Sequence, residues 1–225
     1  MDSFIEAVHL SKTFRIGKHS VPVLRGVDLN VARGEWIALL GASGSGKTTL
    51  LDIIGTISRP DGGELLIEGE DTSRLSGNRL VAFRRRKIGF VFQSFHLLPE
   101  LTILENVMLP AMLNGTGRKE AFRRAGELLE HVGLSDRLRH RPNELSGGEQ
   151  QRTAIARCLV NSPELILADE PTGNLDSVNG KAILSIFRSI HADRNRTIIM
   201  VTHDASVAAE ADRRVILKDG VTVPE

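Results

Sequence analysis

Cysteine, long apolar runs and an excess of charge of either sign are all scarce in this chain of 225 residues. Cys158 is the only cysteine, so no intrachain disulfide can form and nothing indicates an oxidising compartment. No apolar run approaches about 18 residues, which argues against a membrane-spanning helix. The 29 lysine and arginine residues nearly balance 28 aspartate and glutamate residues, so the overall charge favours neither a nucleic acid nor an acidic lipid as partner.

The N-terminal residues lack the basic and apolar segments of a signal peptide. We therefore expect a protein that is cytosolic, or that is held at a membrane by something else. The densest basic run, Arg84-Arg85-Arg86-Lys87, is only four residues long. We interpret it as the solvated end of a helix before the next strand rather than as a nucleic-acid site.

Strand-like and helix-like runs alternate along the chain, which predicts an α/β fold with a mainly parallel sheet. The predicted strands are Ile5–Leu10, Val27–Val31, Trp36–Leu40, Glu64–Ile67, Ile88–Phe92, Leu165–Ala168, Thr197–Val201 and Arg214–Leu217. The early strands are expected to be short, because Gly17, Pro22, Gly26 and Gly34 interrupt them. They are expected to form an antiparallel layer.

The stretch from residue 94 to residue 160 has a different sequence pattern. Helical patterns at Ile103–Leu113, Lys119–Val132 and Gly147–Val160 follow one another without a convincing strand between them. We therefore expect one nucleotide-binding domain over residues 1–225. Its core would consist of about residues 1–93 and 161–225, with an inserted helical subdomain at about 94–160.

A glycine-rich segment, Gly41-Ala42-Ser43-Gly44-Ser45-Gly46-Lys47-Thr48, fits the pattern G-x-x-x-x-G-K-[ST]. The apolar run Trp36–Leu40 precedes it, and a helix-like run beginning at Thr49 follows it. A strand that leads through such a turn into a helix presents backbone N–H groups to a polyphosphate. Lys47 would reach the β- and γ-phosphates, and the Thr48 hydroxyl would bind Mg²⁺. The segment, with Thr49, predicts a nucleoside triphosphate site.

Two carboxylates, Asp169 and Glu170, follow the apolar run Leu165–Ala168. An aspartate at the carboxyl end of a strand beside the phosphate loop suits Mg²⁺, through water. Glu170 would point to the other side, toward a water that attacks the γ-phosphate, which is the place for a general base or a water-orienting group. The alternative is an acidic pair that caps a helix before Pro171.

A second glycine-rich turn, Leu145-Ser146-Gly147-Gly148-Glu149-Gln150, opens another predicted helix. It offers N–H groups and the positive end of a helix dipole to phosphate oxygens. Because two such loops of one chain cannot readily wrap the same γ-phosphate, the turn suggests a second chain. The alternative is that Ser-Gly-Gly is an ordinary helix start. His203 follows the buried strand Ile198–Val201, and Gln93 ends another strand, so either side chain can face the phosphates. The alternative for a lone histidine such as His203 is a structural role.

These segments, in this order and together with Asn174-Leu175-Asp176, resemble the nucleotide-binding subunit of an ABC transporter over essentially the whole chain. The Leu-Ser-Gly-Gly segment is highly specific to that superfamily. The resemblance implies a homodimer that closes head to tail on two ATP molecules, each lying between Gly41–Thr48 of one subunit and Ser146-Gly147-Gly148 of the other.

The resemblance also implies roles for single residues. Gln93 would contact Mg²⁺ and report to the membrane partner, and Asp176 would communicate across the dimer interface. His203 would hold the γ-phosphate, and Glu170 would activate water. The partners implied are integral membrane permease subunits, which would hold the chain at the cytoplasmic face of the inner membrane.

Two departures from the family pattern stand out. The family commonly stacks a tyrosine on adenine near the N-terminus, but this chain has no tyrosine, and Phe14 is the matching aromatic residue. Recognition by stacking alone leaves the use of GTP open. Glu149 stands where many members have glutamine directly after the glycines, a change we expect to be tolerated because the backbone and Ser146 make the phosphate contacts.

A narrower resemblance follows from Phe92–Pro99, Leu101–Val107 and Ala168–Ser177. These segments look like the group that serves lipoprotein release, macrolide export and cell division, in which the ATPase drives a permease with few membrane helices. The segment after Gln93, through about Leu113, is expected to meet that permease. Its apolar residues are Phe95, Leu97, Leu98 and Leu101. The alternative for these residues is ordinary packing of the helical insertion.

We therefore interpret the chain as an Mg²⁺-dependent ATPase subunit of an ABC transporter. A soluble ABC-type ATPase of DNA repair or translation is the alternative, disfavoured by a single uninterrupted cassette without a basic stripe. A GTPase switch would leave Leu145–Gln150 unexplained, and a structural scaffold would leave Lys47, Asp169, Glu170 and His203 unexplained.

Overall fold

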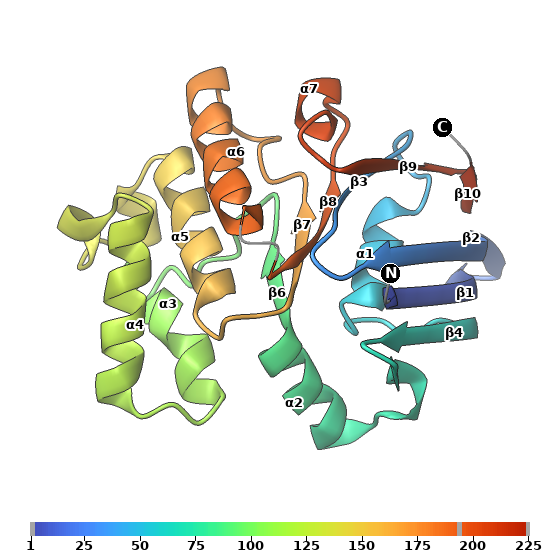
Figure 1. Ribbon diagram of the computed structural model, residues 1–225, viewed down its shortest axis with the longest axis horizontal. Coiled ribbons are helices and arrows are strands. Elements are labelled where there is room, and N and C mark those ends of the chain that lie inside the picture. The colour runs from blue at the N-terminus through green and yellow to red at the C-terminus, as the bar shows by residue number, and fades with distance from the viewer. Residues whose placement is uncertain (1–2, 193–194, 224–225) are drawn as a thin grey trace. The chain divides into compact units, whose positions relative to one another are not determined.

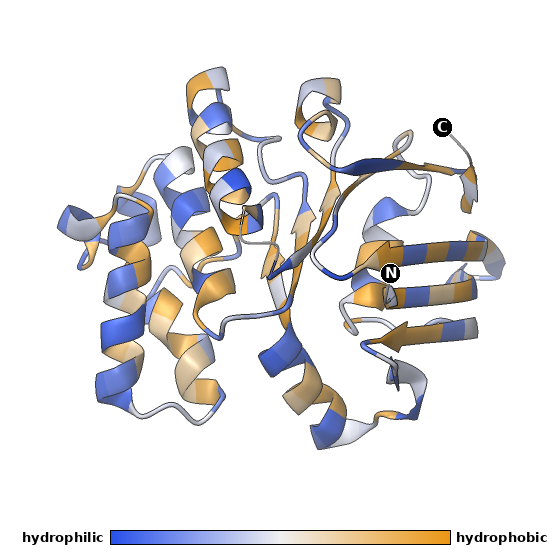
Figure 2. Ribbon diagram, in the orientation of Figure 1, coloured by the Kyte–Doolittle hydropathy of each residue, from blue (hydrophilic) through white to orange (hydrophobic). Residues whose placement is uncertain are grey.

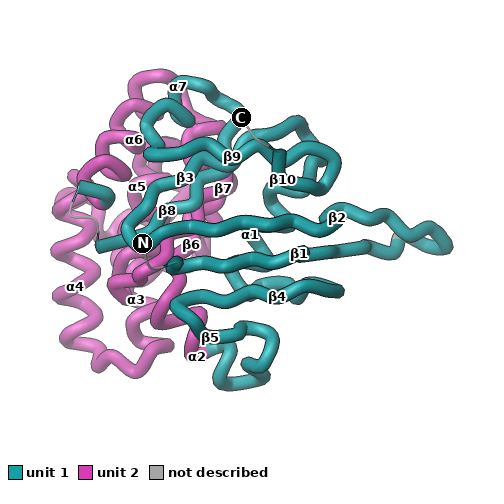
Figure 3. The backbone as a smooth tube through the Cα atoms, turned by 45° about the vertical axis from the view of Figure 1, so that its right-hand side comes forward, with its two compact units in different colours: residues 1–81, 191–225 teal, residues 82–190 magenta. Residues whose placement is uncertain are grey.

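The computed structural model describes residues 3–192 and 195–223. The chain, whose elements are labelled in Figure 1, separates into two compact units, which Figure 3 shows in different colours. Unit 1 comprises residues 1–81 and 191–225, and unit 2 comprises residues 82–190. Helix α2 (Gly77–Lys87) crosses the first boundary in the chain, and its last four residues are the basic run, as expected.

Unit 1 contains an antiparallel sheet in the order β2–β1–β4–β5. Its strands are β1 (Ser3–Ile16), β2 (His19–Ala32), β4 (Gly62–Ile67) and β5 (Glu70–Asp71). From Val27 to Val31 buried and exposed residues alternate along β2, and the alternating hydropathy of the strand is visible in Figure 2. This two-residue period places one face of the sheet in a core. The expected antiparallel N-terminal layer is confirmed.

The expectation that these early strands are short is wrong, because β1 and β2 are 14 residues each. Gly17 occupies the turn between them with φ 61°, and Pro22 pairs with Thr13 inside the hairpin. Proline is tolerated there because β2 is the edge strand of its sheet and its missing N–H costs no ladder bond. Gly26, with φ 98°, lies beside a register shift. Bulges therefore bend the strands at these residues without ending them.

Unit 1 also contains parallel strands. Strand β3 (Trp36–Leu40) pairs in parallel with β8 (Thr197–Val201) on one side and with β9 (Arg213–Lys218) on the other. Strand β10 (Val221–Val223) adds to β9 in the antiparallel sense. Every residue of β8 is buried, as continuous apolar runs predict for strands covered on both faces. Helices α1 (Lys47–Ile54) and α7 (Ala205–Ala208) follow β3 and β8.

Unit 2 contains the parallel pair β6 (Ile88–Val91) and β7 (Leu165–Asp169), with Ile88 opposite Leu165. Its helices are α3 (Ile103–Leu113), α4 (Arg118–His131), α5 (Gly147–Leu159) and α6 (Ser177–His191). Apolar residues of α3, α4 and α5 form a buried cluster that includes Val107, Ala125 and Ala156. The limits of the helical subdomain at about residues 94 and 160 stay a prediction.

In the described part of the chain, three short 3₁₀ helices occur, at Thr72–Arg74, Ser135–Arg137 and Pro142–Glu144. The predicted class is confirmed: an α/β fold with an antiparallel N-terminal sheet and predominantly parallel pairing elsewhere. Within residues 3–192 and 195–223, no helix is long and apolar enough to cross a membrane.

Candidate functional site

The predicted phosphate loop lies in unit 1 between β3 and α1, and its backbone conformation requires glycine. Gly41, Gly44 and Gly46 have φ values of 153°, 78° and 104°, which residues with a side chain rarely adopt. A Cβ on Gly41 would overlap the carbonyl oxygen of Leu217, and a Cβ on Gly46 would lie 2.8 Å from Leu24 Cδ2. The glycines therefore let the loop approach its neighbours closely and enter α1.

Lys47 and Ser45 are the buried polar residues of this loop. Lys47 is 8% exposed and its Nζ donates hydrogen bonds to the carbonyl oxygens of Gly41 (2.9 Å) and Ala42 (2.8 Å). The Ser45 hydroxyl is buried and has no hydrogen-bond partner among the described residues. A buried hydroxyl without a partner calls for an explanation, and an acceptor such as a phosphate oxygen would supply one. Thr48, the second residue of α1, is exposed.

His203 lies at the same edge of the parallel strands as the phosphate loop. Leu39 of β3 pairs with Val201 of β8, so the carboxyl ends of both strands meet there. The Thr202 N–H bonds Leu39 O, and His203 follows as an exposed residue. The next residue, Asp204, caps α7, and the Ser206 hydroxyl and N–H that donate to its carboxylate lower its pKa.

Phe14, the predicted adenine-stacking residue, is 42% exposed on β1. The Lys12 Nζ lies 5.7 Å from the centroid of its ring, within the range of a cation–π contact. An exposed aromatic face is suited to stacking, and the role stays a prediction.

In unit 2, Asp169 is the last residue of β7, and Glu170 follows with φ 43°. Glu170 is therefore in the left-handed region, and a turn rather than strand alternation sets its direction. Its carbonyl accepts the Gly173 N–H at 3.0 Å. A Cβ on Gly173 would lie 3.1 Å from Gln93 Nε2 and 3.2 Å from Glu170 Oε2. The turn therefore places Gln93 and Glu170, predicted separately from the sequence, on the same side of Gly173, each within 3.2 Å of the position that its Cβ would occupy.

The second glycine-rich turn begins α5 with a capping box. The Ser146 hydroxyl accepts the Glu149 N–H at 3.3 Å, and Glu149 Oε2 accepts the Ser146 N–H at 2.9 Å and its hydroxyl at 2.8 Å. The hydrogen bonds that the Ser146 N–H and hydroxyl donate to the Glu149 carboxylate keep the pKa of Glu149 below its usual value. The bond from the Ser146 backbone has the largest effect, and Arg137 adds to it. Glu149 thus has a structural role at the position where the family pattern differs.

Asp176 caps α6 and, through Asn179, contacts the same turn. The N–H groups of Val178 and Asn179 donate to Asp176 Oδ1 at 2.9 Å, and Asn179 Nδ2 donates to Oδ2 at 2.7 Å. Hydrogen bonds from Asn179 and Val178 lower the Asp176 pKa. A Cβ on Gly148 would overlap Asn179 Oδ1, so the turn and the start of α6 are in close contact. Sequence reasoning missed Asn179, since an asparagine three residues after a capping aspartate has no distinct pattern.

The predicted residues therefore fall into one set per unit. Unit 1 holds Phe14, the loop Gly41–Thr48 with Thr49, and His203, while unit 2 holds Gln93, the turn Ser146–Gly148, Asp169, Glu170 and Asp176. Within the described ranges, no group of three or more histidine, cysteine, aspartate and glutamate side chains is placed to hold a metal ion. The predicted Mg²⁺ ligands, Thr48, Gln93 and Asp169, include only one such residue, so their role stays a prediction.

Comparison with known proteins agrees with these motifs. The family model described as ABC transporter matches residues 24–173. The lipoprotein-releasing system ATP-binding protein LolD of Geobacter metallireducens is 51% identical over the full length of both chains. The macrolide export ATP-binding/permease protein MacB of Rhodopirellula baltica is 51% identical over 98% of this chain, which spans a third of that protein.

Among solved structures, the bacterial ABC transporter cassette MJ0796, solved as a dimer, matches with a TM-score of 0.92 and 43% identity, covering 98% of this chain and 97% of that one. A post-hydrolysis dimer of the same cassette, bound to ADP and Pi, matches with a TM-score of 0.91. The chain belongs to the ABC transporter family and is an ATP-binding cassette of the group that contains LolD and MacB.

Proposed function

We propose that this chain is the Mg²⁺-dependent ATP-hydrolysing subunit of an ABC transporter that powers a permease of the lipoprotein-release or macrolide-export type. The observation that carries the proposal is the phosphate loop, whose buried Ser45 hydroxyl has no hydrogen-bond partner among the described residues, while Lys47 Nζ donates to two loop carbonyl oxygens. The full-length similarity to LolD supports the choice of group. A soluble ATPase of DNA repair or translation is not favoured by these relatives.

The residues of unit 1 would bind the nucleotide. The loop N–H groups, Ser45 and Thr49 would hold phosphate oxygens, and the Lys47 ammonium would exchange its two carbonyl acceptors for β- and γ-phosphate oxygens. Phe14 would stack on the base.

Thr48, Gln93 and Asp169 would hold Mg²⁺, directly or through water. When bound, the ion neutralises charge that develops on the phosphates.

Hydrolysis needs a water that is oriented and deprotonated. We assign this role to Glu170, whose carboxylate oxygen and the Gln93 amide nitrogen both lie beside Gly173. Gln93 Nε2 also bonds Asn174 Oδ1 at 3.3 Å, which orients its amide group. His203 would donate a hydrogen bond to the γ-phosphate from the edge where β3 and β8 end.

A second copy of the chain would complete each site. The turn Ser146–Gly148 of one subunit would bind the γ-phosphate held by the loop of the other, with Asp176 at the interface between them. The dimers of MJ0796 support this arrangement. ATP would favour the closed dimer by binding it more tightly than the open form, and hydrolysis would reverse closure.

The surface that would meet the permease lies in unit 2. A pocket of about 340 Å³ is lined by apolar residues, among them Phe90 and Phe92, and by the basic residues Arg84, Arg85 and Arg157. Phe90 and Phe92 stack with ring centroids 5.4 Å apart. A lining that is both apolar and basic fits a short cytoplasmic helix of a permease that has apolar and acidic side chains. Such a partner would place the chain at the cytoplasmic face of the inner membrane.

Affinity purification of the tagged chain from detergent-solubilised native membranes tests this proposal. We expect a permease with few membrane helices and a large extracytoplasmic domain to co-purify. Leu98, 43% exposed in the predicted contact segment, provides the variant Leu98→Glu, which should lose the permease and keep ATP hydrolysis. Phe122→Glu, at a 54% exposed residue of α4, is the matched control and should keep both. Recovery of soluble proteins alone would contradict the proposal.

A further inference from the structure

Gln151 is a fully buried polar residue that the assignments above leave without a role. It lies on α5, one turn beyond the Ser146–Gly148 turn, with 0% of its surface exposed. Its Nε2 donates a 2.7 Å hydrogen bond to the carbonyl oxygen of Pro171. Its Oε1 is buried and accepts no hydrogen bond from the described residues.

This arrangement is costly for stability. Burying an amide group whose carbonyl oxygen has no donor forfeits the hydrogen bonds that the group makes with water. A leucine or methionine of similar volume would fill the same space without that cost, and one would expect it if packing were the only requirement. The single bond to Pro171 is therefore the feature of Gln151 that needs a functional explanation.

The segment that Gln151 holds contains the residue assigned as the general base. Pro171 directly follows Glu170, and the Glu170 backbone is in the left-handed region with φ 43°. Because the ring of Pro171 restricts its own φ, fixing its carbonyl also restricts the peptide that joins it to Glu170. The hydrogen bond from Gln151 thus limits how far Glu170 can turn.

The same helix contacts this segment a second time, through Gly148 and Asn179. Asn179 lies against Gly148 and is bonded to Asp176 by its side chain and its N–H. Residues 170–179 are therefore attached to α5 near both ends, by Gln151 and by Gly148. A displacement of the N-terminus of α5 would be transmitted to Glu170 of the same chain.

We propose that Gln151 is a positioning residue for hydrolysis, which links the Ser146–Gly148 turn to Glu170 within one chain. Engagement of the turn by the partner subunit's nucleotide would set Glu170 for the nucleotide of its own subunit, so that each site reports on the other. This inference rests on the proposed function, because it requires hydrolysis at two shared sites.

The test compares Gln151→Leu and Gln151→Met with Thr153→Val. Thr153 is equally buried on α5, but among the described residues its hydroxyl bonds the Glu149 carbonyl of its own helix and no other group, so it controls for loss of a buried hydrogen bond. We expect kcat for ATP to fall about 10- to 100-fold in both Gln151 variants, the effect of misplacing a catalytic group by about 1 Å. KM for ATP should equal that of the Thr153 control. The melting temperature should equal or exceed that of the control.

Dimer formation separates positioning from folding. In a Glu170→Gln background, Gln151→Leu should still form the ATP-dependent dimer in size-exclusion chromatography, because the Ser146–Gly148 turn is intact. Equal kcat values in the Gln151 and Thr153 variants would overturn the proposal. The proposal would also be overturned if both Gln151→Leu and Gln151→Met lost the ATP-dependent dimer or thermal stability together with kcat. A wild-type chain without ATPase activity would instead refute the proposed function.

Discussion

Glu170 differs from the residues of β7 that precede it in backbone conformation and in the direction of its side chain. It leaves the extended conformation directly after β7, and its side chain reaches toward Gly173 and Gln93 instead of continuing the alternation of the strand. A left-handed conformation is costly for a residue with a side chain and is commonly retained where function requires it. The backbone at Glu170 therefore supports its assignment as the residue that activates water.

The substitution Glu170→Gln tests this role. Glutamine keeps the size of the side chain but cannot accept a proton, so the turnover rate for ATP should fall about 10²- to 10⁴-fold. The dissociation constant for ATP, measured by a fluorescent analogue, should change little, because the phosphate loop is unaltered. Turnover like that of the wild type would remove Glu170 from the mechanism.

Glu149 contributes to stability through its charge at the start of α5. Glu149→Ala should lower the free energy of unfolding by about 1 kcal/mol, the usual value of a lost cap interaction. The loss should be smaller in Glu149→Gln, whose amide oxygen still accepts the Ser146 N–H. Denaturant unfolding monitored by circular dichroism measures both changes.

The pH dependence of this effect follows from the lowered pKa of Glu149. Because the folded-state pKa lies below the ordinary value of 4.5, the charge stabilises the fold fully above about pH 4.5, and the contribution disappears as the pH falls through the folded-state pKa. The difference in stability between wild type and Glu149→Gln should therefore shrink on acidification. A difference that grows toward low pH would contradict the capping role.

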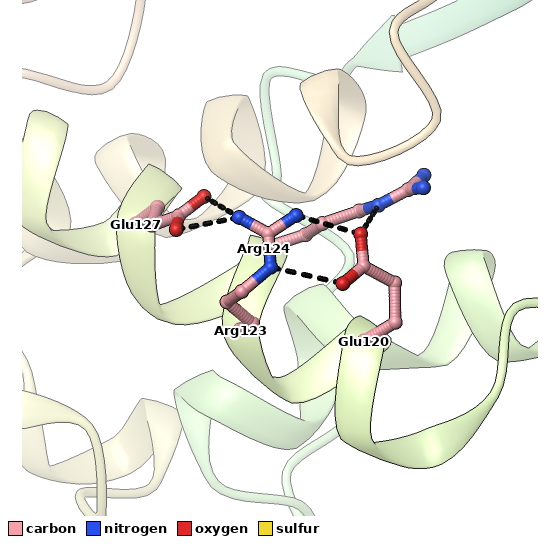
Figure 4. A network of polar contacts seen from close by, with 4 residues as sticks. All are labelled: Glu120, Arg123, Arg124 and Glu127. Carbon is pink, nitrogen blue, oxygen red and sulfur yellow. Dashed lines mark hydrogen bonds and ion pairs between the residues drawn. The ribbon is translucent and has the colours of Figure 1, made fainter.

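At the scale of elements, helix α4 is stabilised on its exposed face by ion pairs between successive turns. Arg123 bonds Glu120 and Glu127, and Arg124 also bonds Glu120 (Figure 4). The spacing of three and four residues brings these side chains together on a helix. Hydrogen bonds from Arg123 and then Arg124 lower the pKa of Glu120 to about 2.

This pKa can be measured directly by NMR titration of the Glu120 side-chain carboxyl group. The midpoint should lie near pH 2, well below the ordinary 4.5, and should move upward in Arg123→Ala. Arg118→Ala is the control on the same helix and should leave the Glu120 midpoint unchanged. High salt should raise the midpoint, since exposed ion pairs are screened. A Glu120 midpoint near 4.5 in the wild type would show that the pairs do not persist in solution.

Sequence patterns predicted some elements accurately and missed others. Strand β3 and helix α3 have the predicted bounds, because a continuous apolar run and a Thr102 cap with Glu105 mark them locally. The predictions did not include α6, α7 or β10. Strand β10 is three residues long and exists through its pairing with β9, a long-range contact that local composition does not encode.

At the scale of the whole molecule, the residues proposed for catalysis are divided between the two compact units, and the Ser146–Gly148 turn is proposed to serve a second copy of the chain. A bulky cation at Ser146 should therefore block hydrolysis without affecting the loop that binds ATP. We expect Ser146→Arg to abolish ATP turnover and ATP-dependent dimerisation, measured in the Glu170→Gln background, while the monomer binds ATP as the wild type does.

Ser135→Arg is the matched control for this prediction. Ser135 is an exposed serine of the same unit that begins a short 3₁₀ helix, so the new charge should leave turnover and dimerisation intact. Normal turnover in Ser146→Arg would remove the basis for a site shared between two chains.

The sequence by itself determined the family and predicted the nucleotide loop and most residues of the candidate site, because phosphate binding needs glycine, lysine and hydroxyl residues at fixed spacing along one strand–turn–helix. Only the tertiary structure decided that β1 and β2 continue through Pro22 and Gly26, since pairing at a sheet edge overrides local breakers. It likewise brought Gln93 to Glu170, Asn179 to Gly148 and Gln151 to Pro171. Contacts between residues 20 to 80 positions apart depend on how the chain folds back on itself, which no local pattern records.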